Sequence, residues 1–395
     1  MSRAFLVVMD SVGIGGAPDA DRFFNGIVPD TGANTLGHIA QARPGGLSLP
    51  NLDRLGLGAA VALASGAAAP GLGAAPEGCW GAAQGISPGK DTPTGHWELA
   101  GVPVPFAWHV FPQEVPAFPE ALVAAVRKAA GVDGILGNCH ASGTEILKAL
   151  GAEHMRTGWP VCYTSTDSVF QVAAHEERFG LDRLLDLCRT IAPLLHDMGV
   201  GRVIARPFVG SERDGFERTE RRKDFAMAPP APTLCDWAQA GGRQVHGLGK
   251  IGDIFSMQGI DDLTTGSDAA LMQELEEAVV VAAEGSLTFA NFVEFDSKYG
   301  HRRDVKGYAE ALERFDLGIG QCLSLLRPGD LMLITADHGN DPTWPGTDHT
   351  RERVPVLVAG VGAHEAGIVD FVDVAASVAA HLGLAERGPG RSFLP

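Results

Sequence analysis

The chain has 395 residues, of which 45% are apolar and 20% are charged, and its 31 Lys and Arg against 48 Asp and Glu give a formal net charge of −17. This composition is typical of a globular protein, and the length suggests two domains with enough apolar material for a buried core. The acidic balance excludes broad electrostatic binding to nucleic acid or anionic membranes, so we expect anionic ligands to be held by a few basic groups or by metal ions.

Short apolar runs that indicate strands buried on both faces alternate with segments of helical spacing. In chain order the expected strands are 4–9, 202–208, 244–248, 289–295, 331–335 and 354–358. The helical patterns lie at 268–284, 306–327 and 373–384. This alternation predicts an α/β fold with a mainly parallel central sheet flanked by helices.

The segment 107–226 differs from the rest of the chain in its sequence pattern. It has helical patterns of its own at 117–130 and 181–198, and it ends in the highly charged stretch 211–224. We therefore expect an α/β cap domain at this position. The cap would be inserted into a catalytic core domain made of residues 1–106 and 227–395.

Three of the expected strands lead into an aspartate. FLVVMD ends at Asp10, FVEFD at Asp296 and LITAD at Asp337. Taken alone, each aspartate is more simply a helix cap or a turn residue. In an open parallel sheet, however, the carboxyl ends of the strands line the ligand crevice, so the three carboxylates would converge and would need a cation.

Three histidines add to this pattern. His301 follows Asp296 in DSKYGHRRD, His338 is next to Asp337, and His349 lies in GTDHTRE. A lone histidine is more often structural than a ligand, but six candidates in this pattern are hard to explain by packing. Three Asp and three His would form a binuclear site of mixed oxygen and imidazole ligands, which suits Mn²⁺, Zn²⁺ or Fe²⁺ better than Ca²⁺.

The segment GKDTPTGHWELAG places two hydroxyl groups among glycines. Thr92 and Thr94 lie next to Lys90, Asp91 and His96. Two interpretations are equally supported by these residues. The segment is a turn followed by a helix cap, or a tight turn aims one threonine at a substrate while a metal lowers the pKa of its hydroxyl.

Seven blocks of the sequence resemble the phosphopentomutases of the alkaline phosphatase superfamily. They are VVMDSVGIGGAPDA, GKDTPTGHWELAG, YTSTDSVFQVAAHE, ARPFVG, GLGKIGDIF, FDSKYGHRRD and ITADHGNDPTWPGTDHTRERVPVL. They run in order from about residue 5 to about residue 358, so the resemblance covers essentially the whole chain. It implies an alkaline-phosphatase-like core and an isomerase of nucleoside metabolism that interconverts ribose 1-phosphate and ribose 5-phosphate, and likewise the 2-deoxyribose pair.

The resemblance also implies two Mn²⁺ ions and a phosphorylated threonine. The implied ligands of one ion are Asp10, Asp337 and His338, and those of the other are Asp296, His301 and His349. Thr92 corresponds to the nucleophile that carries the phosphate and bridges the metals. The implied activator is a sugar 1,5- or 1,6-bisphosphate.

The resemblance assigns substrate contacts as well. Ser165 and Asp167 match positions that meet the sugar hydroxyls, and Arg206, Arg218 and Lys250 match phosphate contacts. A mutase must keep water away from its phosphothreonine, and the inserted domain is a plausible lid for that purpose.

Two segments depart from the family pattern. Pro93 stands where a methionine is more usual, and ERRKDFAM at 220–227 replaces the common NRHDYAL. The second departure concerns the cap-side phosphate contacts, Arg218 above all.

Two further interpretations belong to other classes of protein. The same plan of metals and a hydroxyl serves cofactor-independent phosphoglycerate mutase, phosphatases and sulfatases, although a serine in place of Thr92 would be expected for the first of these. A catalytically inactive metal-binding module is the other alternative. Such inactive homologues usually lack metal ligands or the nucleophile, whereas this sequence has all six candidate ligands and Thr92.

The cysteines and the N-terminus indicate the compartment. Six cysteines are scattered without a Cys-x-x-Cys pair, which is typical of buried thiols in a reducing compartment. The apolar run at 4–9 is too short for a signal peptide, and no run approaches eighteen apolar residues. We expect a cytoplasmic protein that is a monomer, binds small-molecule sugar phosphates, and binds neither nucleic acid nor membranes.

Overall fold

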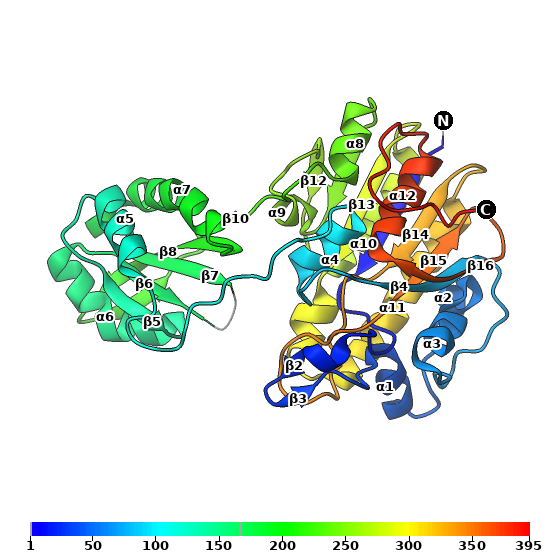
Figure 1. The fold of residues 1–395 in the computed structure, drawn as a ribbon, viewed down its shortest axis with the longest axis horizontal. Helices are drawn as coiled ribbons and strands as arrows, with labels where there is room; N and C mark the ends of the chain where they lie inside the picture. Colours follow the sequence, from blue (N-terminus) through cyan, green and yellow to red (C-terminus); the bar gives the residue numbers. More distant parts are fainter. Residues whose placement is uncertain (1, 166–167) are drawn as a thin grey trace. The chain divides into compact units, whose positions relative to one another are not determined.

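The computed structural model describes residues 2–165 and 168–395. Contacts between Cα atoms divide the chain into two units. We call Met1–Pro105 together with Ala228–Pro395 the core unit, and Phe106–Met227 the cap unit. Each unit has its own sheet and is described by itself (Figure 1).

The core unit is built on an eight-stranded sheet. In spatial order its strands are β12 (Asp262–Thr264), β11 (Val245–Leu248), β13 (Leu287–Phe292), β1 (Ala4–Met9), β14 (Leu331–Thr335), β15 (Val354–Ala359), β4 (Cys79–Gln84) and β16 (His364–Asp370). Only β15 runs antiparallel to its two neighbours among these strands. The expected mainly parallel sheet is therefore confirmed. All six residues of β1 are buried, because this strand lies between β13 and β14 in a sheet that is covered by helices on both faces (Figure 1).

The prediction of a strand over 289–295 is wrong at its C-terminal end. β13 stops at Phe292, and Phe295–Gly300 form a π-helix instead. Phe295 is apolar because its ring packs against Tyr308 and Phe315 on a neighbouring helix. An apolar run can thus extend beyond its strand when the next turn packs against the core.

Helices cover both faces of the core sheet (Figure 1). One group contains α1 (Thr35–Ala42), α2 (Pro50–Leu55), α3 (Leu57–Ser65), α10 (Asp268–Val281) and α11 (Val305–Leu325). The other contains α4 (Thr92–Leu99), α8 (Leu234–Ala240), α9 (Ile251–Ile254) and α12 (Phe371–His381). The three helices predicted in this unit correspond to α10, α11 and α12. A short 3₁₀-helix and a small hairpin, Ala20–Arg22 and β2 (Phe24–Asn25) with β3 (Val28–Pro29), precede α1.

The cap unit has a six-stranded mixed sheet with helices on both faces. Its strands are β5 (Leu136–His140), β6 (Val161–Thr164), β7 (Val169–His175), β8 (Arg202–Ser211), β9 (Gly215–Arg218) and β10 (Lys223–Ala226). Its helices are α5 (Glu120–Ala130), α6 (Gly143–Thr157), α7 (Leu181–Asp197) and the π-helix Glu176–Gly180. The predicted strand at 202–208 is β8, so it belongs to this sheet. Both hydrophobic clusters of the unit consist of its own residues.

None of the helices in the described ranges combines the length and the apolar character needed to cross a bilayer.

Candidate active site

The fold places three aspartates at one edge of the core sheet. Asp10 directly follows β1, Asp337 comes two residues after β14, and Asp296 lies in the π-helix after β13. Because these three neighbouring strands are parallel, their carboxyl ends meet at the same edge. All three side chains are buried, with 0% to 6% of each residue exposed.

The structure brings the three expected histidines to these carboxylates. Nε2 of His301 and Nε2 of His349 lie 3.1 and 3.3 Å from the Asp296 carboxylate. Nε2 of His338 lies 3.3 Å from Asp337 Oδ2 and 3.5 Å from Asp10 Oδ1. Two groups of ligand atoms could each hold a metal ion, and His338 is common to both: Asp10, Asp337 and His338, and Asp296, His338 and His349. The second group differs from the expected set of Asp296, His301 and His349, because it contains His338 in place of His301.

Several polar atoms in this cluster fit a bound cation. Within the described residues, Asp10 Oδ1 and Asp337 Oδ2 are buried and accept no hydrogen bond. The Nε2 atoms of His301 and His349 face each other at 3.1 Å. Buried oxygens without partners and opposed ring nitrogens are unfavourable unless positive charge lies among them. The donor set of carboxylates and imidazoles fits a divalent transition metal.

Two of the histidines are oriented by their other ring nitrogen. Nδ1 of His301 lies 2.6 Å from the Thr347 carbonyl oxygen, and Nδ1 of His338 lies 3.1 Å from the Gly339 carbonyl oxygen. A carbonyl can only accept, so Nδ1 carries a proton. When the ring is neutral, Nε2 therefore presents its lone pair to the cluster. This arrangement is common for histidines that bind metals.

The pKa values of the acids reflect crowding of negative charge. Burial raises the pKa of Asp10 well above its usual range, and the carboxylates of Asp337 and Asp296 raise it further. Burial would also raise the pKa of Asp296, but the charge of His349 and the hydrogen bonds from His301 and His349 outweigh it and hold the pKa well below normal. The cluster therefore needs positive charge, which protons or cations can supply.

The pKa of His349 also reflects opposing effects of burial and nearby charge. Burial would lower the pKa of His349, but the nearby Asp296 carboxylate raises it to about 9. A proton on this ring and a metal ion would compete for the same nitrogen.

Thr92 is the first residue of α4, and its hydroxyl reaches the cluster. Its Oγ1 lies 3.3 Å from Nε2 of His338. Asp91 caps the helix by accepting a hydrogen bond from the Thr94 backbone N–H at 3.0 Å. Thr94 is buried, and its hydroxyl donates to Asp91 at 2.8 Å. The two threonines thus have different surroundings, and Thr92 is the one next to a candidate ligand.

Pro93 is compatible with this helix start. It occupies the first turn of α4. The backbone N–H groups in a first helical turn have no partner within the helix, so the missing N–H of a proline removes no helical hydrogen bond. The departure from the family pattern at this position therefore does not disturb the local fold.

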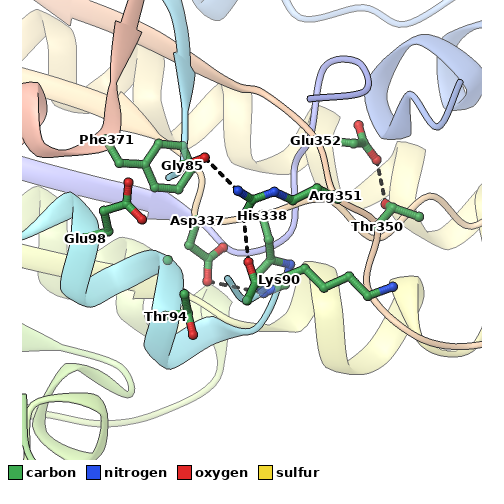
Figure 2. A pocket seen from close by; sticks show the side chains of 12 residues that line it. Gly85, Lys90, Thr94, Glu98, Asp337, His338, Thr350, Arg351, Glu352 and Phe371 are labelled. Atoms are coloured by element: carbon green, nitrogen blue, oxygen red, sulfur yellow. Dashed lines mark hydrogen bonds and ion pairs between the residues drawn. The ribbon is translucent and has the colours of Figure 1, made fainter. Parts of the chain in front are cut away.

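Arg351 and Glu98 fix the loop that leads into α4 (Figure 2). The Arg351 guanidinium donates to the carbonyl oxygens of Gly85 and Gly89, each at 2.6 Å. The Glu98 carboxylate accepts the backbone N–H groups of Ile86 at 2.7 Å and of Ser87 at 2.9 Å. The small cavity between these side chains has about 10 Å³, which suffices for a single water molecule and not for a sugar phosphate.

Sequence reasoning did not find the side chains that hold the candidate ligands. Asn340 donates to Asp296 Oδ1 at 2.7 Å, and Arg303 donates to Asn340 and to the carbonyl oxygen of Asp348. Asn291 donates to Asp10 Oδ2 at 2.8 Å. One signal was available for Asn291, because it is a polar residue in the otherwise apolar and fully buried strand LTFANF.

The expected substrate contacts are distributed over both units. Ser165, Arg206 and Arg218 are in the cap unit, Lys250 is in the core unit, and Asp167 lies outside the described residues. Lys250 is exposed, and its charge acts on Asp10.

Arginine charges gather on the cap sheet. Arg206 donates to Gln171 Oε1 at 3.1 Å, and Arg218 donates to the Tyr163 hydroxyl at 3.1 Å. Burial lowers the pKa of Arg206, and the positive charges of Arg222 and Arg218 contribute.

Comparisons with known proteins show what this chain is similar to. A family model described as the metalloenzyme superfamily matches residues 2–386. Two phosphopentomutases, from Allorhizobium ampelinum and from a Chelativorans species, are each 54% identical to this chain; the matches cover all of this chain and 100% and 98% of the relatives. A solved phosphoglycerate mutase from Leishmania mexicana has 14% identity and a TM-score of 0.47, covering 99% of this chain and 97% of its own. A likeness this distant carries no argument about the chemistry.

Proposed function

The chain belongs to the phosphopentomutase family of the metalloenzyme superfamily, and from this premise we propose that it interconverts ribose 1-phosphate and ribose 5-phosphate through a phosphothreonine at Thr92. The 2-deoxyribose pair would react in the same way. The observation that carries the proposal is the Thr92 hydroxyl, which lies 3.3 Å from His338 beside the carboxylates of the cluster. Thr94 is a weaker candidate because it is buried and its hydroxyl is bonded to Asp91.

Six residues would hold two divalent metal ions, which we propose to be Mn²⁺. They are Asp10, Asp296, His301, Asp337, His338 and His349. Five of them form the two candidate groups, and His301 is included because its Nε2 lies 3.1 Å from the Asp296 carboxylate. The oxygens of Asp10 and Asp337 that lack hydrogen bonds support this assignment. When bound, the ions would lower the pKa of the threonine hydroxyl and stabilise negative charge on the transferred phosphoryl group. Asn340 and Asn291 would keep the carboxylates in place by donating to Asp296 and Asp10.

The chain's own residues account for the two halves of the reaction. In the first half, the Oγ–P bond of phosphorylated Thr92 breaks while a hydroxyl of the pentose monophosphate forms a new O–P bond, and the proton of that hydroxyl passes to the released Thr92 oxygen. The product is a pentose bisphosphate. In the second half, the Thr92 oxygen forms a bond to the other phosphoryl group as its sugar O–P bond breaks, and the threonine proton passes to the released sugar oxygen. The second product is the isomeric monophosphate. A sugar bisphosphate from solution would prime the unphosphorylated protein by the second half alone.

The substrate would be recognised by charged groups from both units. We propose that Arg206, Arg218 and Lys250 bind phosphate and that Ser165 and Asp167 bind the sugar hydroxyls. The gathering of arginine charges on the cap sheet supports the phosphate role, since guanidinium groups match phosphate oxygens in pairs. In this proposal the cap keeps water away from the phosphothreonine during transfer.

The proposal is tested by assaying the protein with ribose 1-phosphate. Protein freed of metal by a chelator should be inactive, and Mn²⁺ with a catalytic trace of pentose bisphosphate should restore the formation of ribose 5-phosphate, followed by ³¹P NMR. Thr92→Ala should abolish turnover, whereas Thr94→Val should retain a measurable part of it.

A generic aryl phosphate serves as the control substrate. Little hydrolysis is expected from a mutase. Rapid aryl phosphate hydrolysis without conversion of ribose 1-phosphate would contradict the proposal and favour a phosphatase.

A further inference from the structure

The geometry points to His96, held in one orientation by Asn291, as the residue that positions the Thr92 hydroxyl. This inference rests on the proposed function and deepens it. His96 acts through Thr92 and Asp337, so we assign it a positioning role.

His96 connects the candidate nucleophile to a candidate ligand. It lies four residues after Thr92 on α4, and none of its surface is exposed. Its Nδ1 is 3.0 Å from the Thr92 carbonyl oxygen, with which it shares a hydrogen bond. The same Nδ1 is 3.0 Å from Asp337 Oδ2. One ring nitrogen therefore touches both the backbone of Thr92 and the carboxylate of Asp337.

Asn291 and the Thr92 carbonyl agree on which nitrogen of His96 carries the proton. Its amide nitrogen lies 2.8 Å from Asp10 Oδ2 and 3.2 Å from Nε2 of His96. An amide nitrogen only donates, so its two protons go to these two atoms and Nε2 of His96 accepts. The Nδ1 of His96 must then carry the ring proton, which it donates to the Thr92 carbonyl oxygen; Asp337 Oδ2 lies 3.0 Å from the same nitrogen without a hydrogen bond. The flipped amide would set its carbonyl oxygen against the Asp10 carboxylate, which is unfavourable.

This chain of donors leaves the right oxygens available. Asn291 occupies Oδ2 of Asp10, and the Ser11 backbone N–H occupies Oδ1 of Asp337 at 3.0 Å. The other oxygen of each carboxylate has no hydrogen bond among the described residues. Asn291 and His96 thus hold Asp10 and the first turn of α4 without blocking the atoms that face the cluster.

Packing alone does not account for an imidazole at this position. The His96 ring stacks on Phe289 with 6.1 Å between ring centroids and 21° between planes. A phenylalanine could make the same contact without two buried nitrogens that each need a partner. The polar contacts therefore distinguish a positioning role from simple core filling.

The first test reads the tautomer of His96 in metal-free protein by ¹⁵N NMR of labelled histidine, with His96→Asn identifying the signal. The parent should show the Nδ1–H tautomer. Asn291→Leu, which removes both donors and keeps the branching at Cγ, should keep this tautomer because the Thr92 carbonyl still accepts, but it should shift the Nε2 resonance because Nε2 loses its donor. The Nε2–H tautomer in the parent would overturn the inference, as would an unchanged signal in the Asn291 variant. If Asn291→Leu does not fold, Asn291→Ala is read in the same way.

The second test separates positioning from packing by steady-state kinetics with ribose 1-phosphate. His96→Phe should lower kcat about 100-fold, the size of effect expected when a reacting group is misplaced by about 1 Å, and should change KM less than about threefold. His96→Asn, whose amide can replace the Nδ1 donor, should recover at least about tenfold of the loss. Phe289→Leu changes the stacking partner only and should leave kcat within about threefold.

Two outcomes of the kinetic test would overturn the inference: an equal loss in Phe289→Leu and His96→Phe, or no recovery in His96→Asn. Failure of the proposed function would look different. The parent itself would then not convert ribose 1-phosphate, while the NMR comparison, made without metal or substrate, would still decide the role of Asn291 and His96.

Discussion

The chemistry of the cluster depends on individual oxygens that the protein leaves without hydrogen bonds. Asp337 has one carboxylate oxygen bound by the Ser11 N–H, while the other is buried and without a hydrogen bond among the described residues. A carboxylate in this state has little to gain from water or protein and much to gain from a cation. The candidate ligands and the candidate nucleophile are thus explained by the same local electrostatics.

We predict that Asp337→Asn weakens the affinity for Mn²⁺ by more than about 100-fold, because it removes a charged ligand. Losing a residue that only supports a ligand usually costs about 10–100-fold. Metal content after dialysis, measured by mass spectrometry of the metal, checks this. Asp21→Asn is the matched control, since Asp21 is an exposed aspartate of the same unit. Equal metal retention in the two variants would contradict the role of Asp337.

His38 offers a pH-dependent contribution to stability away from the cluster. Its Nδ1 lies 2.5 Å from Oδ2 of the buried Asp341, and this hydrogen bond raises the pKa of His38 above its usual value. A raised histidine pKa means that protonation favours the folded state, so the contribution is fully present below about pH 6.5, the unfolded value, and is lost as the pH rises through the folded value.

We therefore predict that His38→Gln lowers the free energy of unfolding more at pH 6 than at pH 9. Urea unfolding of the variant and the parent at both pH values measures the difference. An equal loss at both pH values would show that His38 stabilises the fold by packing instead of charge.

Among the elements, β1 and β14 are joined at their N-terminal ends by a buried ion pair. The Arg3 guanidinium contacts both oxygens of Asp330, at 2.9 and 2.5 Å, and both residues are buried. The pair fixes the register of the strands that deliver Asp10 and Asp337. A buried charge that loses its partner is destabilising, whereas removing both charges is tolerated better.

We predict that Arg3→Met lowers the free energy of unfolding by about 3–5 kcal/mol and that the double variant Arg3→Met/Asp330→Asn recovers part of this loss. Arg54→Met, which breaks the exposed pair with Glu77, should change little. Urea unfolding curves provide the comparison. If the double variant were less stable than the single one, the loss would reflect packing of the Arg3 chain.

The sequence predicted the inner strands well and the outer ones poorly. Runs such as LMLIT are apolar because both faces are buried, so β1 and β14 were found with their observed bounds. β4 was not found, since CWGAAQ lacks β-branched residues. Its glycine has a physical reason, because a Cβ at Gly81 would lie 2.4 Å from the Gly367 carbonyl oxygen on β16. Such close packing between strands leaves no periodic signal.

The candidate site shows a similar division. Strand-end aspartates followed by histidines made the six ligand candidates recognisable in the sequence. Their supporting residues were not, because a hydrogen bond such as that from Asn291 to Asp10 joins positions 281 residues apart. Only the fold brings such pairs together. The difference between Thr92 and Thr94 was also undecided by local sequence and depends on which hydroxyl is already bonded.

For the molecule as a whole, the cap unit has what it needs to fold alone. Its two hydrophobic clusters lie on its own helices and strands, with many residues fully buried. A segment with its own core generally folds as an independent domain. Cap residues 106–227, expressed alone, should therefore unfold cooperatively in urea and give dispersed NMR spectra. A collapsed, non-cooperative segment would contradict this.

The complementary prediction concerns the core unit with the cap replaced by a short Gly/Ser linker. It should still bind metal, since all six candidate ligands are in the core unit. It should lose mutase activity and retain at most a slow metal-dependent phosphatase activity, because the proposed sugar contacts at Ser165 and Asp167 are gone. Retained mutase turnover would contradict the proposed role of the cap.

The central claim is that Thr92 carries the phosphoryl group. The most direct measurement is fragmentation mass spectrometry of the metal-loaded protein after treatment with pentose bisphosphate, locating phosphate between the two threonines of α4. We predict one phosphate per chain on Thr92, removed when excess pentose monophosphate is added. Phosphate on Thr94, or conversion of ribose 1-phosphate without any phosphorylated residue, would contradict the account.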